Sequence, residues 1–246
     1  MALPRVLVSP PIVEALVDLR AAVIAPAEAF EALSRELLAE YPTAKTRRGI
    51  KAELRVEQGK LIPPTAQDLG FQGVLLRSKD GTAIVQLRPD GFTFNNVTRY
   101  MGGDALLAEA LRLWSRFAGD LRPTAVTRVA LKYLNQLKLP FRPGDELSKY
   151  LTAVPPTPDG APQTVSEFLS RVVAHDEGVR ATVITTQQLT TAEPGVPLTV
   201  IDVDAFCEGE FSIDARELRP LLDGLRDIKN RTFFALLTDE AIELFI

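Results

Sequence analysis

Carboxylates at alternating positions are the side chains of this sequence best suited to chemistry. Asp202 and Asp204 share one face of an expected strand at Leu198–Cys207, about 7 Å apart because alternate residues of a strand point the same way. Glu14 and Asp18 lie on one face of an expected strand at Ile12–Arg20. These oxygens could bind a hard cation, but the same alternation is typical of the solvated face of a sheet. We favour the solvated face and predict no metal site.

The single histidine and the single cysteine are not placed to act as a catalytic pair. His175 falls in an expected turn, where the sequence offers neither a nucleophile nor an orienting partner. Cys207 ends a strand without a basic neighbour to activate its thiol, so we expect a small buried hydrophobe. One cysteine also excludes an internal disulfide. We predict no catalytic residue and no cofactor.

Recognition of nucleotides or nucleic acids is not favoured by the motifs present. Gly102 and Gly103 precede a helix but lack the lysine and spacing of a phosphate-binding loop. The strand at Lys51–Glu57 alternates charges as triphosphate-tunnel enzymes do, but not in their Glu-x-Glu-x-Lys order. A basic patch also lies here, without the interleaved aromatic residues that bind nucleic acids. It comprises Lys45, Arg47, Arg48, Lys51, Arg55 and Lys60.

The composition is that of a globular protein. Of 246 residues, 46% are hydrophobic and 24% charged, which leaves enough apolar material for one large domain or two small ones. No apolar run reaches the roughly 18 residues that a bilayer span requires. Pro4, Pro10 and Pro11 interrupt the first apolar stretch, so it does not match a signal peptide. We therefore expect a soluble cytoplasmic protein with no membrane contact.

The first half reads as strands enclosed by two helices. After the opening strand, Pro26 begins an apolar-striped helix that Pro42 ends, and Asp104 is the expected N-cap of a second helix. Between the helices, alternation and turn residues predict four strands. They are Lys51–Glu57, Phe71–Arg77, Thr82–Arg88 and Phe92–Asn95.

The second half repeats this order. A long strand at Val126–Lys138 precedes a short helix at Asp145–Leu151 and a proline-rich loop at Pro155–Thr164. Further strands are expected at Val165–Val173, Val179–Gln188 and Leu198–Cys207. Asp214 and Glu217 have capping-box spacing, Pro220 predicts a break in the last long helix, and Thr238 is a candidate cap for a final short one.

Consecutive antiparallel strands with packed helices predict an α+β fold. We expect a two-layer arrangement in which one continuous sheet carries the helices on a single face. The two β-α-β(3-4)-α pseudo-repeats would span residues 1–123 and 124–246. This order resembles the architecture of TATA-binding protein, a β-α-β4-α unit used twice, which is a likeness of fold without implied function.

Three short motifs carry a second resemblance. They are Pro10-Pro11-Ile12-Val13-Glu14-Ala15, Leu131-Lys132-Tyr133-Leu134-Asn135-Gln136 followed by Pro140, and Phe233-Phe234-Ala235-Leu236-Leu237-Thr238. Their order resembles a sporadically distributed bacterial and archaeal family of uncharacterised proteins of about 250 residues. Where that family has arginine before the tyrosine, this chain has Lys132. The resemblance implies no catalytic set, and the family's patchy distribution suggests defence, immunity or toxin-neutralising roles.

If the helices cover one face of the sheet, charged residues of both signs gather on the other. The candidate binding residues are Glu14, Asp18, Arg20, Arg55, Arg88, Arg128, Lys132 and Asp202. Mixed charge suits selective protein contacts. Our leading hypothesis is therefore a non-enzymatic binding protein, an accessory, immunity or antitoxin-type factor. The alternative is an enzyme or small-ligand binder that uses the charged residues of this face.

Charge is shared unevenly along the chain. Residues 1–123 hold 16 Lys and Arg against 14 Asp and Glu, whereas residues 124–246 hold 12 against 18. A head-to-tail homodimer could pair the basic half of one copy with the acidic half of the other. The strands Ile12–Arg20 and Val126–Lys138, if they lie at sheet edges, would supply unpaired backbone groups for that contact. A monomer is the alternative.

Overall fold

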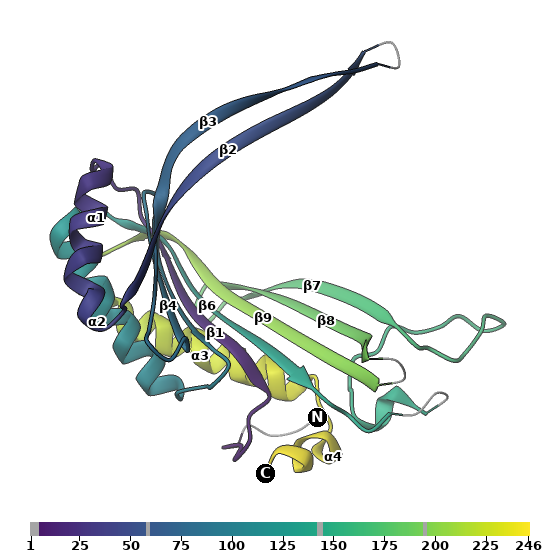
Figure 1. The fold of residues 1–246 in the computed structure, drawn as a ribbon. Helices are drawn as coiled ribbons and strands as arrows, with labels where there is room; N and C mark the ends of the chain where they lie inside the picture. Colours follow the sequence, from purple (N-terminus) through teal and green to yellow (C-terminus); the bar gives the residue numbers. More distant parts are fainter. Residues whose placement is uncertain (1–4, 58–59, 142–144, 194–195) are drawn as a thin grey trace.

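The chain folds around a single antiparallel sheet. In this computed structural model, residues 5–57, 60–141, 145–193 and 196–246 are described, with side chains given outside 52–66 and 192–196. The described residues form a nine-stranded sheet in the order β2-β3-β4-β5-β1-β6-β9-β8-β7, drawn in Figure 1. The expected α+β class with a large antiparallel sheet is confirmed.

Five strands come from the first half of the chain. They are β1 (Ile12–Arg20), β2 (Thr43–Glu57), β3 (Lys60–Arg77), β4 (Ala83–Arg88) and β5 (Gly91–Val97). The helices of this half are α1 (Ala27–Glu36), which continues into a 3-10 turn at Leu37–Ala39, and α2 (Gly103–Leu121). The β2–β3 hairpin is much longer than the predicted strands and projects beyond the rest of the sheet (Figure 1).

The second half supplies the other four strands. They are β6 (Val126–Leu137), β7 (Phe168–Asp176), β8 (Ala181–Glu193) and β9 (Val196–Phe211). The helices are α3 (Ala215–Ala235) and α4 (Asp239–Ile242), with 3-10 turns at Leu147–Lys149 and Glu243–Phe245. The predicted short helix at Asp145–Leu151 is thus a single 3-10 turn. Ser9 N–H donates to the Phe245 carbonyl at 3.1 Å, which ties the N-terminal segment to the last turn.

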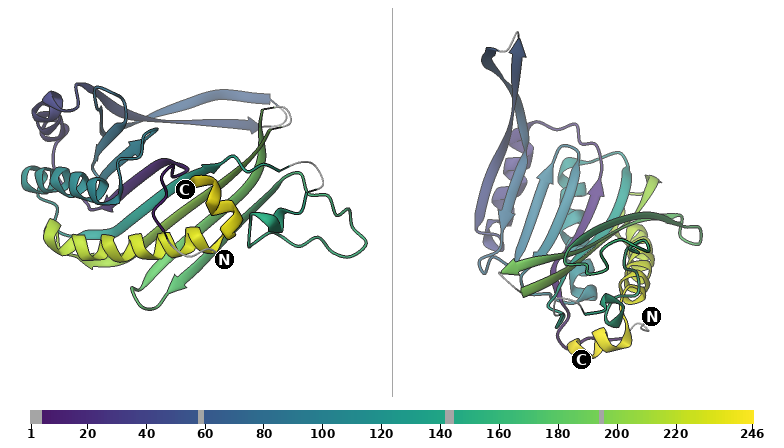
Figure 2. Two further views of the ribbon diagram at one scale, coloured as in Figure 1. Left: turned by 90° about the horizontal axis from the view of Figure 1, so that it is seen from below. Right: turned by 90° about the vertical axis from the view of Figure 1, so that its right-hand side faces the viewer.

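Alternation along the strands separates an apolar face from a polar one. Ala15, Val17 and Leu19 of β1 are fully buried, while Leu16 and Asp18 between them face the other way, into a depression of the opposite face. Helices α1, α2 and α3 lie on the apolar side in Figures 1 and 2: α1 contacts β3 and β4, α2 contacts β1 and β5, and α3 contacts β6 and β9. We call the opposite side of β1, β4, β5, β6 and β9 the polar face.

Aromatic side chains fill the space between α1, α2 and the sheet. Phe92 lies 6.0 Å from Trp114 and 5.8 Å from Phe117 between ring centroids, and Phe30 lies 6.4 Å from Phe117. All four are completely buried. The Trp114 indole N–H donates to the Ile213 carbonyl at 2.8 Å, so even its polar atom is satisfied. This rigid apolar layer fixes the strands that carry the polar face.

Two predicted helix features are wrong. Pro220 does not break α3, which continues from Ala215 to Ala235 although the proline lacks the N–H that would bond to the preceding turn. Leu218 and Leu222 on either side are fully buried and hold the helix against the sheet. Asp104 is not the N-cap of α2; Gly102 holds that position with φ of 93°, and Asp104 lies in the first turn. The predicted cap residues Asp214 and Thr238 are confirmed, since their side chains accept from Arg216 N–H and Ala241 N–H.

Neither of the two strands considered for edge pairing lies at a sheet edge. β1 pairs with both β5 and β6, and β6 pairs with β1 and β9, so both lie at the centre of the sheet. The outermost strands are instead β2 and β7. A homodimer therefore cannot use the backbone groups of Ile12–Arg20 or Val126–Leu137. No helix in the described part of the chain is long and apolar enough to cross a bilayer.

Candidate functional site

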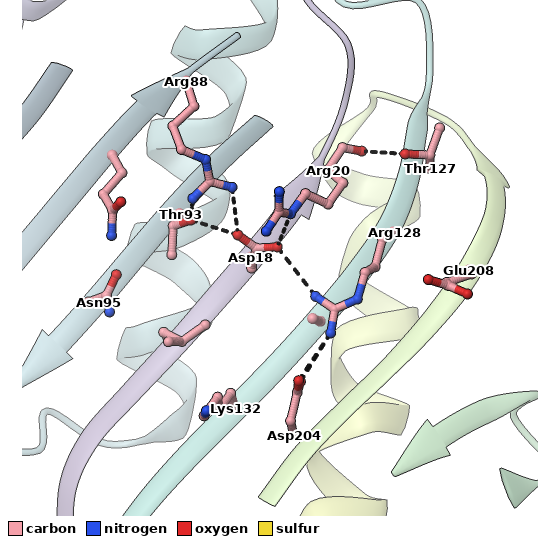
Figure 3. Close-up of a pocket in the computed structure, with 13 residues that line it drawn as sticks. Asp18, Arg20, Arg88, Thr93, Asn95, Thr127, Arg128, Lys132, Asp204 and Glu208 are labelled. Carbon is pink, nitrogen blue, oxygen red and sulfur yellow. Dashed lines mark hydrogen bonds and ion pairs between the residues drawn. The ribbon is translucent and has the colours of Figure 1, made fainter. Parts of the chain in front are cut away.

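Asp18 forms the centre of a charged network on the polar face. Its Oδ1 accepts from Arg88 Nη2 at 2.8 Å and from the Thr93 hydroxyl at 2.7 Å. Its Oδ2 accepts from Arg20 Nε at 2.9 Å and from Arg128 Nη1 at 3.4 Å. Figure 3 shows three guanidinium groups from three strands turned toward this one carboxylate.

The environment of Asp18 favours its ionised form. The side chain is only 9% exposed, and burial alone would raise its pKa. Hydrogen bonds from Arg88 and Thr93, together with the positive charges of Arg88 and Arg20, outweigh burial and hold the pKa of Asp18 below its ordinary 3.8. Asp18 is therefore a fixed anion at neutral pH, a role that suits organisation of the arginines better than proton transfer.

Further carboxylates extend the network in both directions from Asp18. Asp90 pairs with Arg88 and Arg20 at the turn between β4 and β5. Arg128 Nη2 reaches Asp204 at 3.1 Å, and its guanidinium lies 4.1 Å above the Phe206 ring. These contacts hold Arg128 from two sides.

Asp204 differs from Asp18 although both contact Arg128. Burial raises the pKa of Asp204 above its ordinary value, and the charges of Arg128 and Lys132 only partly oppose this effect. Lys132 Nζ pairs instead with Asp202 at 2.8 Å. The two carboxylates on β9 therefore have different partners, and burial outweighs the nearby positive charges at Asp204, whereas at Asp18 it does not.

The network surrounds a depression of about 710 Å³ in the polar face (Figure 3). Residues from β1, β4, β5, β6 and β9 line it. The polar ones are Asp18, Arg20, Gln86, Arg88, Thr93, Asn95, Thr127, Arg128, Lys132, Asp204 and Glu208. Side chains of both charge signs are present, so the arrangement of charges on this surface, rather than its net charge, would select a binding partner.

The structure brings together most of the predicted binding residues. Asp18, Arg20, Arg88, Arg128 and Lys132 line the depression. Glu14 and Asp202 lie beside it without lining it: Glu14 accepts from the Asn95 amide, which lines the depression, and Asp202 pairs with Lys132. Arg55 is not part of the group, because it lies on β2 opposite Ile62 in the projecting hairpin, and its side chain is outside the described residues.

Sequence reasoning missed Thr93, Asn95, Asp90 and Gln86 as members of this site. Thr93 and Asn95 alternate with the fully buried Phe92 and Phe94 on β5, and this alternation was the available signal. Asn95 Oδ1 and Asp202 Oδ1 are buried without a hydrogen-bond partner among the described residues. Of these two residues only Asn95 lines the depression, where its Oδ1 could accept from a bound polar group.

The isolated His175 and Cys207 lie elsewhere. His175 belongs to the end of β7 rather than to a turn, and its Nδ1 lies 3.2 Å from the Thr182 hydroxyl. Cys207 is 5% exposed, with its Sγ 3.5 Å from the Val179 carbonyl, and burial raises the pKa of its thiol. Within the described ranges, no group of three or more His, Cys, Asp or Glu side chains could hold a metal ion.

Comparisons of the sequence with protein-family models and with curated proteins find no match.

Proposed function

We propose that this chain is a non-enzymatic binding protein that engages a protein partner through its polar face. The observation that carries the proposal is the Asp18 network, in which one buried anion arranges Arg20, Arg88 and Arg128 across three strands. Such pre-arranged charges add specificity and speed of association to an interface. Within this proposal, the chain is an accessory, immunity or antitoxin-type factor.

The shape of the sheet supports a macromolecular partner. The polar residues extend over five strands, and the β2–β3 hairpin extends outward at one end of the sheet (Figure 1). β2 carries Lys45, Arg47 and Arg48, which lie at the free edge of the sheet. A partner protein could contact the β2–β3 hairpin through acidic groups and the Asp18 network through charges of both signs.

The finer architecture is part of the same proposal. Strands follow outward from β1 as β5, β4, β3 and β2, and outward from β6 as β9, β8 and β7. We interpret this order as two pseudo-repeats, residues 1–123 and 124–246, in a two-layer arrangement that resembles a duplicated TATA-binding-protein-like unit. The polar face would then be formed where the two halves meet, at β1 and β6.

The proposal is tested by recovery of partners with matched charge reversals. The tagged chain and its Lys132→Glu variant, changed on the polar face, are compared with Arg35→Glu, changed on the exposed side of α1. We expect one protein to co-purify in stoichiometric amount with wild type and Arg35→Glu, and much less with Lys132→Glu. Equal recovery in all three samples would contradict the proposal.

A small polar ligand is the second candidate. The buried, unpaired Asn95 Oδ1 beside a depression of about 710 Å³ favours it specifically. Native mass spectrometry of the purified chain separates the two candidates. A stoichiometric small molecule lost in the Asn95→Leu variant, with no protein partner, would reverse the ranking.

A further inference from the structure

A second cavity lies on the other side of the sheet, between α3, the start of α2 and the N-terminal segment. Its volume is about 670 Å³, and its walls include Pro11, Tyr100, Gly103, Asn135 and Phe233. Lys229 of α3 lines it although this side chain is 6% exposed. The cavity shares no lining residue with the depression around Asp18.

Lys229 lacks the partner that a buried lysine normally has. No carboxylate or hydrogen-bond acceptor contacts its Nζ within the part of the chain that the structure describes. Its neighbour is the ring of Tyr133, whose centroid lies 3.6 Å from Nζ. A buried cation without a counter-ion is costly, so such a group either gives up its proton or awaits a ligand.

The surroundings of Lys229 favour the neutral amine. Burial, together with the positive charge of Arg226 on the same helix, lowers the pKa of Lys229 to about 7. The face of the Tyr133 ring favours the ammonium form and opposes this shift. Desolvation beside a second cation is the arrangement that activates lysines as nucleophiles.

Part of the cavity wall is the start of helix α2, where the Asp104 carboxylate is already paired with Arg226 at 2.7 Å and with Arg219 at 3.0 Å. Helix α2 begins there at Gly103, and no side chain caps its first N–H groups at Gly102. A Cβ on Gly103 would lie 3.2 Å from Arg226 Cδ and 3.3 Å from the Tyr100 hydroxyl, so the helix start and these side chains adjoin. The N-terminus of a 19-residue helix attracts carboxylates.

We propose that this cavity binds a small carbonyl compound bearing a carboxylate, such as a 2-oxo acid, by reversible Schiff-base formation at Lys229. The neutral amine adds to the carbonyl carbon, and a proton passes from nitrogen to oxygen to give the carbinolamine. Loss of that hydroxyl group with the remaining amine proton, as water, leaves a carbon–nitrogen double bond. The step needs no oxidant or reductant, and the carboxylate binds at the start of α2.

Reductive trapping tests the proposal. The full chain is incubated with pyruvate and cyanoborohydride, and adducts are mapped by peptide mass spectrometry. At neutral pH we expect labelling at Lys229 at least about tenfold faster than at Lys149, since Lys149 pairs with Glu240 and its pKa is raised by that contact. Adducts spread over exposed lysines with Lys229 unmodified would overturn the proposal.

Two variants separate reactivity from folding. Lys229→Met keeps the length and apolar stem of the side chain, and it should fold and lose only the specific adduct. Arg226→Gln removes the neighbouring cation, so labelling should slow at neutral pH and recover at alkaline pH. The other titratable groups around the cavity are Tyr133 on β6, Tyr100, Asp104 on α2, Arg5 and Asp227. If the rate of Lys229 labelling depended on pH in Arg226→Gln as it does in wild type, the role of Arg226 would be contradicted.

A matched ketone tests the carboxylate site. Acetone offers the same carbonyl group without an acid. We expect pyruvate to label Lys229 at a rate that saturates with concentration, and acetone to label it more slowly without saturation. If the two probes labelled Lys229 at the same rate and with the same dependence on concentration, carboxylate binding at the start of α2 would be contradicted.

Discussion

Asp18 is the residue whose loss should disturb the polar face most, since three guanidinium groups share its one carboxylate. Asp18→Asn keeps the size of the side chain but leaves Arg88, itself only 16% exposed, without its main counter-ion. We expect the free energy of unfolding to fall by about 3 kcal/mol. Urea denaturation of the two proteins measures this difference.

The matched control is Asp68→Asn on the β2–β3 hairpin. Asp68 also pairs with an arginine, Arg48, at 2.9 Å, but both side chains are more than half exposed. Exposed pairs contribute little to stability, so this variant should unfold as wild type does. Similar losses in both variants would mean that burial of the Asp18 network does not matter.

The contribution of Asp18 should depend on pH in one direction. Its pKa is lower in the folded chain than the ordinary 3.8, so its stabilising effect is complete above that value and is lost as the pH falls through the folded pKa. The stability difference between wild type and Asp18→Asn should therefore be constant near neutral pH and shrink below about pH 4. A difference that grows on acidification would contradict the assignment.

Alternation along the sequence predicts which residues face the polar side but not which of them meet. Period-two alternation on two strands predicts the polar-face positions of Asp18, Arg20, Arg128 and Lys132, because a strand places alternate residues on one face. Their contacts depend on register, which sets Asp18 opposite both Thr93 and Ala130. No local pattern specifies that register.

At the scale of elements, α3 offers a direct test of why Pro220 is tolerated. Pro220 is exposed in the second turn of a helix whose buried side is held by Leu218 and Leu222. Pro220→Ala restores a backbone N–H donor and removes the clash of the proline ring with the preceding turn, and both changes stabilise the folded chain. The greater conformational freedom of the unfolded variant offsets part of this gain in stability. We expect a gain of about 1 kcal/mol in the free energy of unfolding, measured by thermal or urea denaturation. A loss of stability would show that the proline fits this turn without strain.

The length of the β2–β3 hairpin could not be predicted from the sequence. Gly70 lies directly before the predicted strand Phe71–Arg77 and Gly73 lies within it, and both have positive φ, at 73° and 128°. A Cβ on Gly73 would lie 2.3 Å from the Leu87 carbonyl oxygen, so the close approach of β4 requires glycine there. Gly70 is typical of a strand end in the sequence, whereas β3 continues through it.

At the scale of the whole molecule, we propose a homodimer that uses the outermost strands. β2 carries basic residues of the first half, whereas β7 exposes Leu169, Val172 and Val173. Pairing of such edges satisfies their free backbone groups, and the unequal charge of the two halves would add attraction. Light scattering should give the molecular mass of a dimer at low salt, and an average mass that falls toward that of the monomer as the salt concentration rises. A monomer at low salt would contradict the dimer, and a salt-independent dimer would remove the electrostatic reason for it.

The central claim is that a protein partner binds the polar face, and site-specific photo-cross-linking tests it most directly. A photoreactive residue replaces Gln86, which lines the depression, and in a second chain it replaces Arg35 on α1. Cross-linking in the source cells should give one discrete protein adduct from position 86 and none from position 35. An adduct from position 35 alone, or the same adducts from both positions, would contradict the assignment of the polar face as the binding surface.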